Sequence, residues 1–334
     1  MTTRSPKTVA FIGTGVMGAP IAGHLLDAGY QLRVHNRTRS KADALVARGA
    51  VWADSPAEAA RDADVVFTML GLPSDVEDVY LATDGLIRTA RRGAWLIDLT
   101  TSSPQLARDI HDAAEVEDKH AFDCPVTGGD AGAIAGTLTL IAGITEHDAA
   151  PVLPLLETFS SRIYWFERAG AGQTAKLCNQ IGVATCLAGA AELLALAEQA
   201  GLSRTVVAEM VGSGMGGSAQ LSRVMPRAEE GDYKPGFMAT HLAKDLGLAL
   251  AVAEDEGVTL PATETALNLV DLLCQAGGSR LGTQALALLY ADEASGVAAG
   301  LDWSLVAEDT APDGSPARRR YMTNDNERGG LWGL

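Results

Sequence analysis

The chain has 334 residues, of which 47% are apolar and 20% charged, a composition typical of a globular protein rather than a disordered one. Asp and Glu outnumber Lys and Arg by 42 to 26, so the formal net charge at pH 7 is −16. A field of this sign repels nucleic acid and anionic lipid, so neither is expected as a partner.

The sequence shows no feature of a membrane, secreted or metal-binding protein. No run of 18 apolar residues is without a charge or a helix breaker, so no membrane span is expected. The start of the chain, residues 1–7, is short and polar, and the four cysteines are scattered without a C-x-x-C pair. These features favour a cytoplasmic protein with reduced thiols. The six histidines are also dispersed, so no metal site is expected.

The first half of the chain alternates strand-like and helix-like segments. Strands are expected at residues 8–12, 31–35, 65–70, 94–98, 120–124, 137–142 and 162–166. Helices are expected at residues 20–28, 40–48, 56–61, 75–80 and 104–114. This alternation predicts a doubly wound, mostly parallel sheet with helices on both faces.

The second half reads as helical. Residues 173–200 contain no Pro and only two Gly, which predicts a helix about 40 Å long, apolar enough to lie between domains or subunits. Further helices are expected at 203–212, 218–229, 237–256, 262–276 and 284–291. We therefore expect an α/β domain over 1–170, an all-α domain over 171–309 that includes the long helix, and a loose tail over 310–334.

A glycine-rich motif follows the first strand. It matches the dinucleotide-binding pattern G-x-G-x-x-G and opens a helix, with the residues Gly13, Thr14, Gly15, Val16, Met17 and Gly18. Such glycines permit the tight turn, the approach of a pyrophosphate and close helix packing, and the helix N-terminus favours the anion. A second match at 212–217 follows a helical segment instead of a strand, so we interpret it as an interhelical loop.

The end of the second strand indicates the cofactor. An acidic residue there would bind a ribose 2′-hydroxyl and repel a 2′-phosphate. This chain has Asn36, Arg37 and Thr38 instead, with further basic residues close behind. The guanidinium of an arginine suits a phosphate, so the sequence favours NADP(H) over NAD(H).

Two further segments carry polar groups that the scaffold does not need. Thr127, Gly128 and Gly129 follow a strand, and their hydroxyl and amides suit a carboxylate, although a simple strand-to-helix turn has the same composition. Lys176, Asn179 and Gln180 share one face of the long helix at i, i+3 and i+4. A lysine in so apolar a helix must find a polar partner or reach the surface.

Taken together, these segments resemble the β-hydroxyacid dehydrogenase family. The resemblance covers about residues 8–305 and depends on four motifs in order: the Gly13–Gly18 turn, the 125–129 block continuing to 136–139, the 170–179 block with Lys176, and Lys244-Asp-Leu. It implies a Rossmann domain, a long connecting helix and an all-α domain in a homodimer or homotetramer. It also implies an oxidoreductase that interconverts a small β-hydroxyacid and its semialdehyde or keto acid.

The resemblance also implies roles for individual residues. Lys176 matches the catalytic lysine, which gives a proton to the developing alkoxide. Thr127, Gly128 and Gly129 match the loop that binds the carboxylate of the substrate. Residues that match cofactor contacts are Met69, Leu70, Thr101 and Lys244. Thr127 stands where Ser is common, and Gln180 where Asn is common, so whether Asn179 or Gln180 meets the substrate stays open.

Alternative functions follow from the same scaffold. An imine reductase is disfavoured because those enzymes typically carry Asp or Tyr at the position of Lys176. A non-catalytic oligomeric module is disfavoured because both the lysine and the carboxylate loop are present. A decarboxylating sugar-phosphate dehydrogenase of the related type is disfavoured because its helical domain is much larger.

Overall fold

The structure, a computed structural model, describes residues 8–306, so the predicted tail at 310–334 lies outside the described residues. These residues form two compact units. One comprises the chain up to Gln180 together with Gly247–Val258, and the other comprises Ile181–Leu246 together with the residues from Thr259 onward. Each unit is described by itself below.

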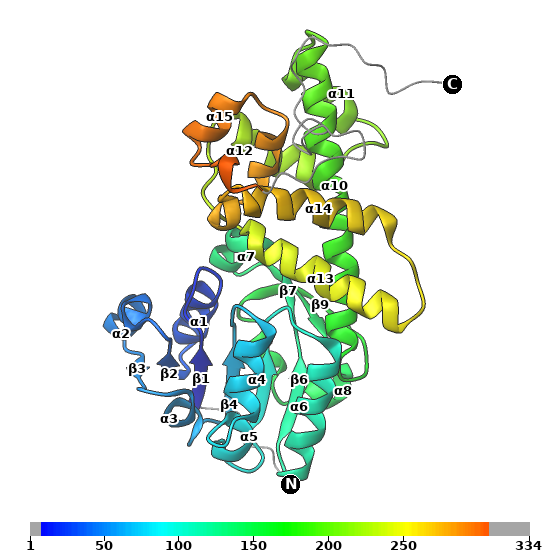
Figure 1. The fold of residues 1–334 in the computed structure, drawn as a ribbon. Helices are drawn as coiled ribbons and strands as arrows, with labels where there is room; N and C mark the ends of the chain where they lie inside the picture. The colour runs from blue at the N-terminus through cyan, green and yellow to red at the C-terminus, as the bar shows by residue number, and fades with distance from the viewer. Residues whose placement is uncertain (1–7, 307–334) are drawn as a thin grey trace. The chain divides into compact units, whose positions relative to one another are not determined.

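The first unit is built on a parallel sheet of six strands (Figure 1). The strands are β1 (Thr8–Ile12), β2 (Gln31–His35), β3 (Val51–Trp52), β4 (Val65–Thr68), β5 (Trp95–Asp98) and β6 (His120–Asp123). Their order is β3-β2-β1-β4-β5-β6, so the chain reverses its direction of travel across the sheet between β3 and β4. Strands β1 and β4 flank this switch point, beyond whose carboxyl ends ligands bind in folds of this type.

The helices of this sheet match the predicted positions closely, except for α5, which was not predicted. They are α1 (Gly18–Asp27), η1 (Arg39–Ala42), α2 (Asp43–Ala47), α3 (Pro56–Ala60), α4 (Pro73–Leu81), α5 (Leu86–Thr89) and α6 (Pro104–Val116). Ser55 and Ser103 cap α3 and α6, each followed by a proline at the first helical position. The expected helix 40–48 is divided into a 3₁₀ turn and a short α-helix.

Both faces of the sheet are buried. Val9 and Phe11 of β1 belong to one hydrophobic core, whereas Ala10 and Ile12 belong to another. Successive residues of a strand point to opposite faces, so each face has its own core. The strands therefore carry continuous apolar runs, as a parallel sheet covered on both sides requires.

A second, three-stranded sheet follows in the same unit. It consists of β7 (Val126–Thr127), β8 (Leu138–Ala142) and β9 (Ser160–Trp165), with α7 (Gly129–Ala135), α8 (Glu146–Ala149) and α9 (Leu153–Leu156) between them. Strand β7 pairs antiparallel to β8, and β8 pairs parallel to β9. The sequence did not predict β3 or β7, because a two-residue strand is too short to show a period.

The remaining elements are helical. They are α10 (Ala171–Gln199), α11 (Arg204–Gly212), η2 (Gln220–Val224), α12 (Met225–Glu229), α13 (Ala239–Asp255), α14 (Pro261–Gln275), η3 (Gly278–Arg280), η4 (Thr283–Leu289), α15 (Glu293–Ala298) and η5 (Trp303–Leu305). From 171 to 306 the structure contains no strand, only the isolated bridge between Met238 and Gly282. This confirms the predicted class, an α/β Rossmann fold followed by a long helix and a helical part.

Two predicted helices differ in type. The segment 218–229 begins as a π-helical turn and becomes α-helical only at α12, where Pro226 occupies the first turn. The segment 284–291 is the 3₁₀ helix η4, most of whose residues are buried. Packing on several sides, which local propensity does not encode, selects the tighter helix there.

Helix α10 has the length and mean hydropathy of a membrane-crossing helix, criteria that a core helix also meets. Its buried side chains form a stripe that includes Leu177, Ala184, Leu187 and Leu194, at the spacing of one helical face. Leu196, in contrast, is exposed in the single chain. The described residues therefore leave part of α10 uncovered, and its predicted position between domains or subunits stays a prediction.

Candidate functional site

The glycine motif forms a turn at the switch point of the sheet. The Gly13 N–H donates to the carbonyl oxygen of His35, and the Met69 N–H donates to that of Ile12, both at 2.9 Å. A Cβ on Gly13 would lie 2.1 Å from the Met69 oxygen, and a Cβ on Gly18 would lie 1.9 Å from the Gly13 oxygen. Because the backbones approach so closely, only glycine fits at these two positions.

The same turn fits a dinucleotide diphosphate. Among residues 8–306, no atom outside Gly15 and its two chain neighbours lies within 4 Å of a Cβ built on Gly15, so this position faces open space. Helix α1 starts three residues later, at Gly18, without a side-chain cap from the described chain, which leaves its N-terminal N–H groups for an anion. The Thr14 hydroxyl is buried and has no hydrogen-bond partner in the described residues. An incoming phosphate oxygen would satisfy it.

Asn36 ties the end of β2 to this turn. Its Oδ1 accepts from the Thr14 N–H at 2.9 Å, and its Nδ2 donates to the Thr38 carbonyl oxygen at 2.9 Å. A carboxylate at this position would keep the first bond and lose the second. Arg37 beside it is exposed, and its guanidinium lies 3.4 Å from the Asp75 carboxylate. An exposed pair at that distance is weak, so the guanidinium is available to a ligand.

A buried polar network connects the carboxyl ends of β4 and β5. Asp98 accepts from the Thr68 hydroxyl at 2.7 Å and from the Thr100 N–H at 3.1 Å. The Tyr80 hydroxyl lies 2.9 Å from that of Thr68. The Leu70 N–H donates to the Thr100 hydroxyl at 2.9 Å. Of the predicted cofactor contacts, Leu70 belongs to this network, and Met69 and Thr101 are the chain neighbours of its members Leu70 and Thr100.

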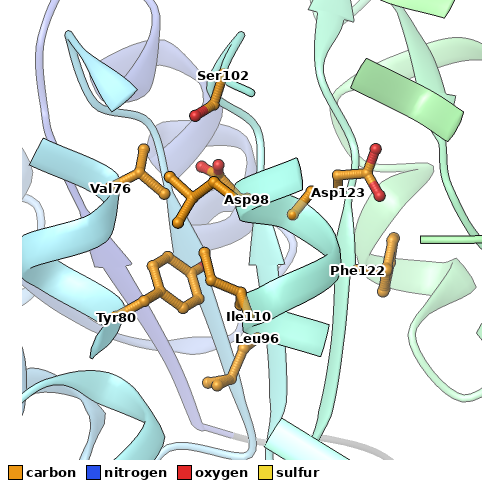
Figure 2. A pocket seen from close by; sticks show the side chains of 10 residues that line it. Val76, Tyr80, Leu96, Asp98, Ser102, Ile110, Phe122 and Asp123 are labelled. Carbon is orange, nitrogen blue, oxygen red and sulfur yellow. The ribbon is translucent and has the colours of Figure 1, made fainter. Parts of the chain in front are cut away.

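A cavity of about 10 Å³ lies next to this network (Figure 2). Tyr80, Asp98, Ser102 and Asp123 are its polar lining, and the other lining residues are apolar. The Ser102 hydroxyl is buried without a hydrogen-bond partner in the described residues. A cavity of this size has room for one water molecule at most, so it is not the substrate site.

Asp123 holds the start of α10. Its Oδ1 accepts from the Gly170 N–H and its Oδ2 from the Gln173 N–H, each at 2.7 Å. Burial raises the pKa of Asp123, and these two N–H donors oppose the rise. The carboxylate thus caps the helix, and its negative charge interacts favourably with the positive, N-terminal end of the helix dipole.

The predicted lysine cluster is brought together one turn later. Lys176 is 6% exposed, and its Nζ donates to the Gln180 Oε1 at 2.8 Å. The Asn179 Nδ2 donates to the same oxygen at 2.8 Å. The amine therefore has a buried amide partner and does not extend to the surface.

The predicted carboxylate loop lies at the end of β7, shortly after β6. Thr127 ends β7 and is half-buried, whereas Gly128 and Gly129 are exposed. Gly128 has a φ of +130° and Gly129 a φ of +66°, values that favour glycine. Their backbone groups open α7 at the carboxyl edge of the sheet, the same edge at which the Gly13–Gly18 turn lies.

Lys244 lies in the other compact unit. Its ammonium is 3.0 Å from the carboxylate of its neighbour Asp245, and both side chains are largely buried.

Three site-building residues were missed by the sequence analysis: Asp98, Asp123 and Gln173. Each aspartate is the last residue of its strand and follows two buried apolar residues, Leu96 and Ile97 in β5 and Ala121 and Phe122 in β6. A charge at the carboxyl end of a buried parallel strand is a signal that was available in the sequence. Gln173 carries no such signal, because its partners are backbone atoms of a loop about 70 positions earlier.

Comparison with known proteins gives consistent matches over both halves of the chain. The model described as the NAD binding domain of 6-phosphogluconate dehydrogenase matches residues 8–167, and that described as NAD-binding of NADP-dependent 3-hydroxyisobutyrate dehydrogenase matches residues 170–290. An NAD-dependent L-serine dehydrogenase of Pseudomonas aeruginosa is 41% identical over 278 residues, which cover 81% of this chain and 93% of the relative.

Solved structures agree with these matches. Mycobacterium tuberculosis 3-hydroxyisobutyrate dehydrogenase with L-serine is similar at a TM-score of 0.77 and 33% identity, covering 84% of this chain and 98% of its own. A Streptomyces aurantiacus imine reductase has a TM-score of 0.58 at 20% identity, covering 86% of this chain and 100% of its own. The second similarity shows a shared fold alone.

Two glycine substitutions separate folding from cofactor binding. We expect Gly15→Ala to leave the free energy of unfolding within about 0.5 kcal/mol of wild type and to raise the Kd for NADPH at least tenfold, because its methyl enters the space for the diphosphate. Gly13→Ala, the control, should lose more than about 2 kcal/mol of stability through its positive φ and its overlap with Met69. Urea unfolding and fluorescence titration measure both; unchanged NADPH binding by a folded Gly15→Ala variant would contradict the assignment of the turn.

The carboxyl of Asp98 predicts a pH dependence of stability. Burial raises the pKa of Asp98 from 3.8 to about 6, with hydrogen bonds from Thr100 and Thr68 opposing the rise. Between these values the folded chain holds a proton that the unfolded chain has lost, so stability falls as pH rises from about 4 to 6. Relative to Asp98→Asn, wild type should lose about 3 kcal/mol over this range and nothing further above it. Urea unfolding of both proteins from pH 4 to 8 tests this; a difference independent of pH would contradict it.

Proposed function

This chain belongs to the β-hydroxyacid dehydrogenase family, as its motifs predict, and from that premise we propose that it is an NADP(H)-dependent oxidoreductase acting on a small β-hydroxyacid and its semialdehyde or keto acid. The observation that carries the proposal is the buried amine of Lys176, hydrogen-bonded to Gln180 just after a helix start that Asp123 fixes at the carboxyl edge of the sheet. L-serine, itself a β-hydroxyacid, belongs among the substrates to test. One relative is named an L-serine dehydrogenase, and one similar solved structure is described as a complex with L-serine.

The proposed chemistry assigns one task to each part of the site. NADP(H), when bound at the Gly13–Gly18 turn, supplies or accepts the hydride. Lys176, as an ammonium, donates a proton to the carbonyl oxygen of the substrate as that oxygen becomes an alkoxide. In the oxidation direction its neutral amine takes the proton of the hydroxyl. Gln180 accepts a hydrogen bond from Nζ and so holds it in place.

The substrate carboxylate is proposed to bind the loop of Thr127, Gly128 and Gly129. The positive φ of both glycines turns the backbone at the first residues of α7, where N–H groups have no helical acceptor. A carboxylate held there fixes the carbonyl carbon of the substrate in one orientation, and such orientation contributes much of the rate acceleration of an enzyme. Asn179 and Gln180 both remain proposed substrate contacts.

The cofactor preference is proposed from the end of β2. Asn36 is neutral and engaged with the glycine turn, and Arg37 projects an exposed guanidinium beside it. We propose that Arg37 and Thr38 bind the 2′-phosphate of NADP(H). Thr101, Met69 and Leu70 are proposed cofactor contacts from the network of Asp98, and Lys244 is proposed to lie on the nicotinamide side.

The wider organisation is also a proposal. Residues 1–170 are assigned to NADP binding and 171–309 to an all-α domain. A homodimer or homotetramer is supported by exposed apolar surface: in the described chain no residue of α11 is buried, and its Val206 and Met210 are each 61% exposed. A cytoplasmic location follows from the composition of the chain.

Replacing the lysine tests the chemistry. Lys176→Ala should keep its fold and its Kd for NADPH and lose at least about 100-fold in kcat, because the proton donor is gone. Cys178→Ala, an exposed change on the same helical turn, is the control and should behave as wild type. The assay panel is glyoxylate, tartronate semialdehyde, methylmalonate semialdehyde, succinic semialdehyde, 3-hydroxyisobutyrate, L-serine and a cyclic imine.

Three outcomes would contradict the proposal. Lys176→Ala turning over at the wild-type rate removes the lysine from the mechanism. Faster turnover of the imine than of any carbonyl substrate favours an imine reductase. Binding of NADPH without turnover of any compound in the panel favours a non-catalytic module.

The basis of cofactor choice is tested at Arg37. Arg37→Ala should raise the KM for NADPH by about 10- to 100-fold, because it removes a charge-assisted hydrogen bond to the 2′-phosphate. The KM for NADH, which lacks this phosphate, should change less than threefold. Arg33→Ala, on the strand β2 that leads to Arg37 and paired with Asp62, is the control. Steady-state kinetics with both cofactors decide; equal effects on NADPH and NADH would show that Arg37 does not bind the 2′-phosphate.

A further inference from the structure

We propose that Gln173 is a positioning residue that fixes Lys176 relative to the loop after β5, so that one side chain aligns the proton donor with the cofactor-binding loop. This inference rests on the proposed function, in which Lys176 moves the proton. It concerns a residue that no motif singled out and that touches neither substrate nor cofactor in the proposed chemistry.

The carboxamide of Gln173 is fully buried and bonded at both ends. Its Oε1 accepts from the Ser102 N–H at 2.9 Å, and its Nε2 donates to the Thr100 carbonyl oxygen at 2.8 Å. These bonds hold residues on both sides of Thr101, a proposed cofactor contact. Thr100 is in turn bonded to Leu70 and Asp98. A movement of Gln173 would therefore move this loop.

The helix around Gln173 has no freedom to slide. Asp123 accepts from the Gly170 and Gln173 N–H groups. A Cβ on Gly172 would lie 2.5 Å from the Ile141 oxygen, and one on Gly143 would lie 2.2 Å from Asp123 Oδ1. Asp123 thus fixes the helix along its axis, and the side chain of Gln173 fixes its rotation.

Lys176 follows on the same side of the helix. It lies three residues after Gln173, which is about 4.5 Å along the axis and nearly one full turn. Its Nζ is held by Gln180, one turn further. A rotation of the first turn of α10 would therefore displace the amine relative to Thr101.

Three variants test this inference. Gln173→Met keeps the side-chain volume and loses the hydrogen bonds to Thr100 and Ser102, so we expect kcat to fall at least tenfold. The KM of the carboxylate substrate should change less than threefold, because the Thr127–Gly129 loop is not bonded to Gln173. Ser103→Ala removes the cap of α6 in the same loop and is the control for stability alone; its kcat should stay within twofold of wild type. Melting temperatures of all variants are measured in parallel.

Gln173→Glu gives a readout that a purely structural role would not produce. A neutral carboxyl can donate to the Thr100 oxygen and accept from the Ser102 N–H, whereas a carboxylate repels that oxygen. The ratio of its kcat to that of wild type should therefore rise at least fivefold as pH falls from 8 to 5. The titratable groups around it (Tyr80 on α4, Asp98 on β5, His111 on α6, Asp123 on β6 and Lys176 on α10) are present in both proteins, so comparison with wild type controls for their own titration.

The outcomes separate this inference from the function on which it rests. If Lys176→Ala is inactive and both Gln173 variants turn over within twofold of wild type at every pH, only this inference is overturned. If Lys176→Ala retains the wild-type rate, the proposed function fails and this inference with it. If Gln173→Met does not fold, the pH dependence of Gln173→Glu decides: a rising ratio supports the inference, and a flat ratio overturns it.

Discussion

The structure of the first unit depends on two carboxylates that are buried at the ends of neighbouring strands. Asp98 and Asp123 are 6% and 2% exposed, and a buried charge is costly unless it is hydrogen-bonded. Each finds its donors in another element, Asp98 in β4 and the loop after β5, and Asp123 in the backbone that opens α10. The requirement to satisfy these groups joins the sheet edge to the helix that carries Lys176.

Close backbone contact provides the second constraint at this edge. Gly13 and Gly18 leave no room for a side chain, whereas Gly15 opens onto free space in the described chain. The same motif therefore contains two glycines required by packing and one that keeps space for a ligand. Thr14, with a buried hydroxyl that lacks a partner among the described residues, marks where that ligand belongs.

The fold alone does not decide the chemistry. An imine reductase shares this fold at 20% identity, so the Rossmann sheet and the long helix are common to carbonyl and imine reduction. In the proposed function, the chemistry depends instead on the side chain at position 176 and on its hydrogen-bond partners. The amine is buried against an amide oxygen, the helix start is capped by a carboxylate, and a glutamine joins that start to a loop of the nucleotide-binding half.

The sequence by itself determined the strand–helix alternation, the glycine turn, the lysine cluster and the family, because each is encoded in local spacing: Lys176 and Gln180 meet at i and i+4 in any helix. It did not reveal β3 or β7, which are too short to show a period, or the 3₁₀ geometry of residues 283–289, which packing imposes. Nor did it reveal the contacts of Gln173, since its partners, Thr100 and Ser102, lie about 70 residues earlier. Only the tertiary structure brings such groups together, because a hydrogen bond between distant segments leaves no period in either of them.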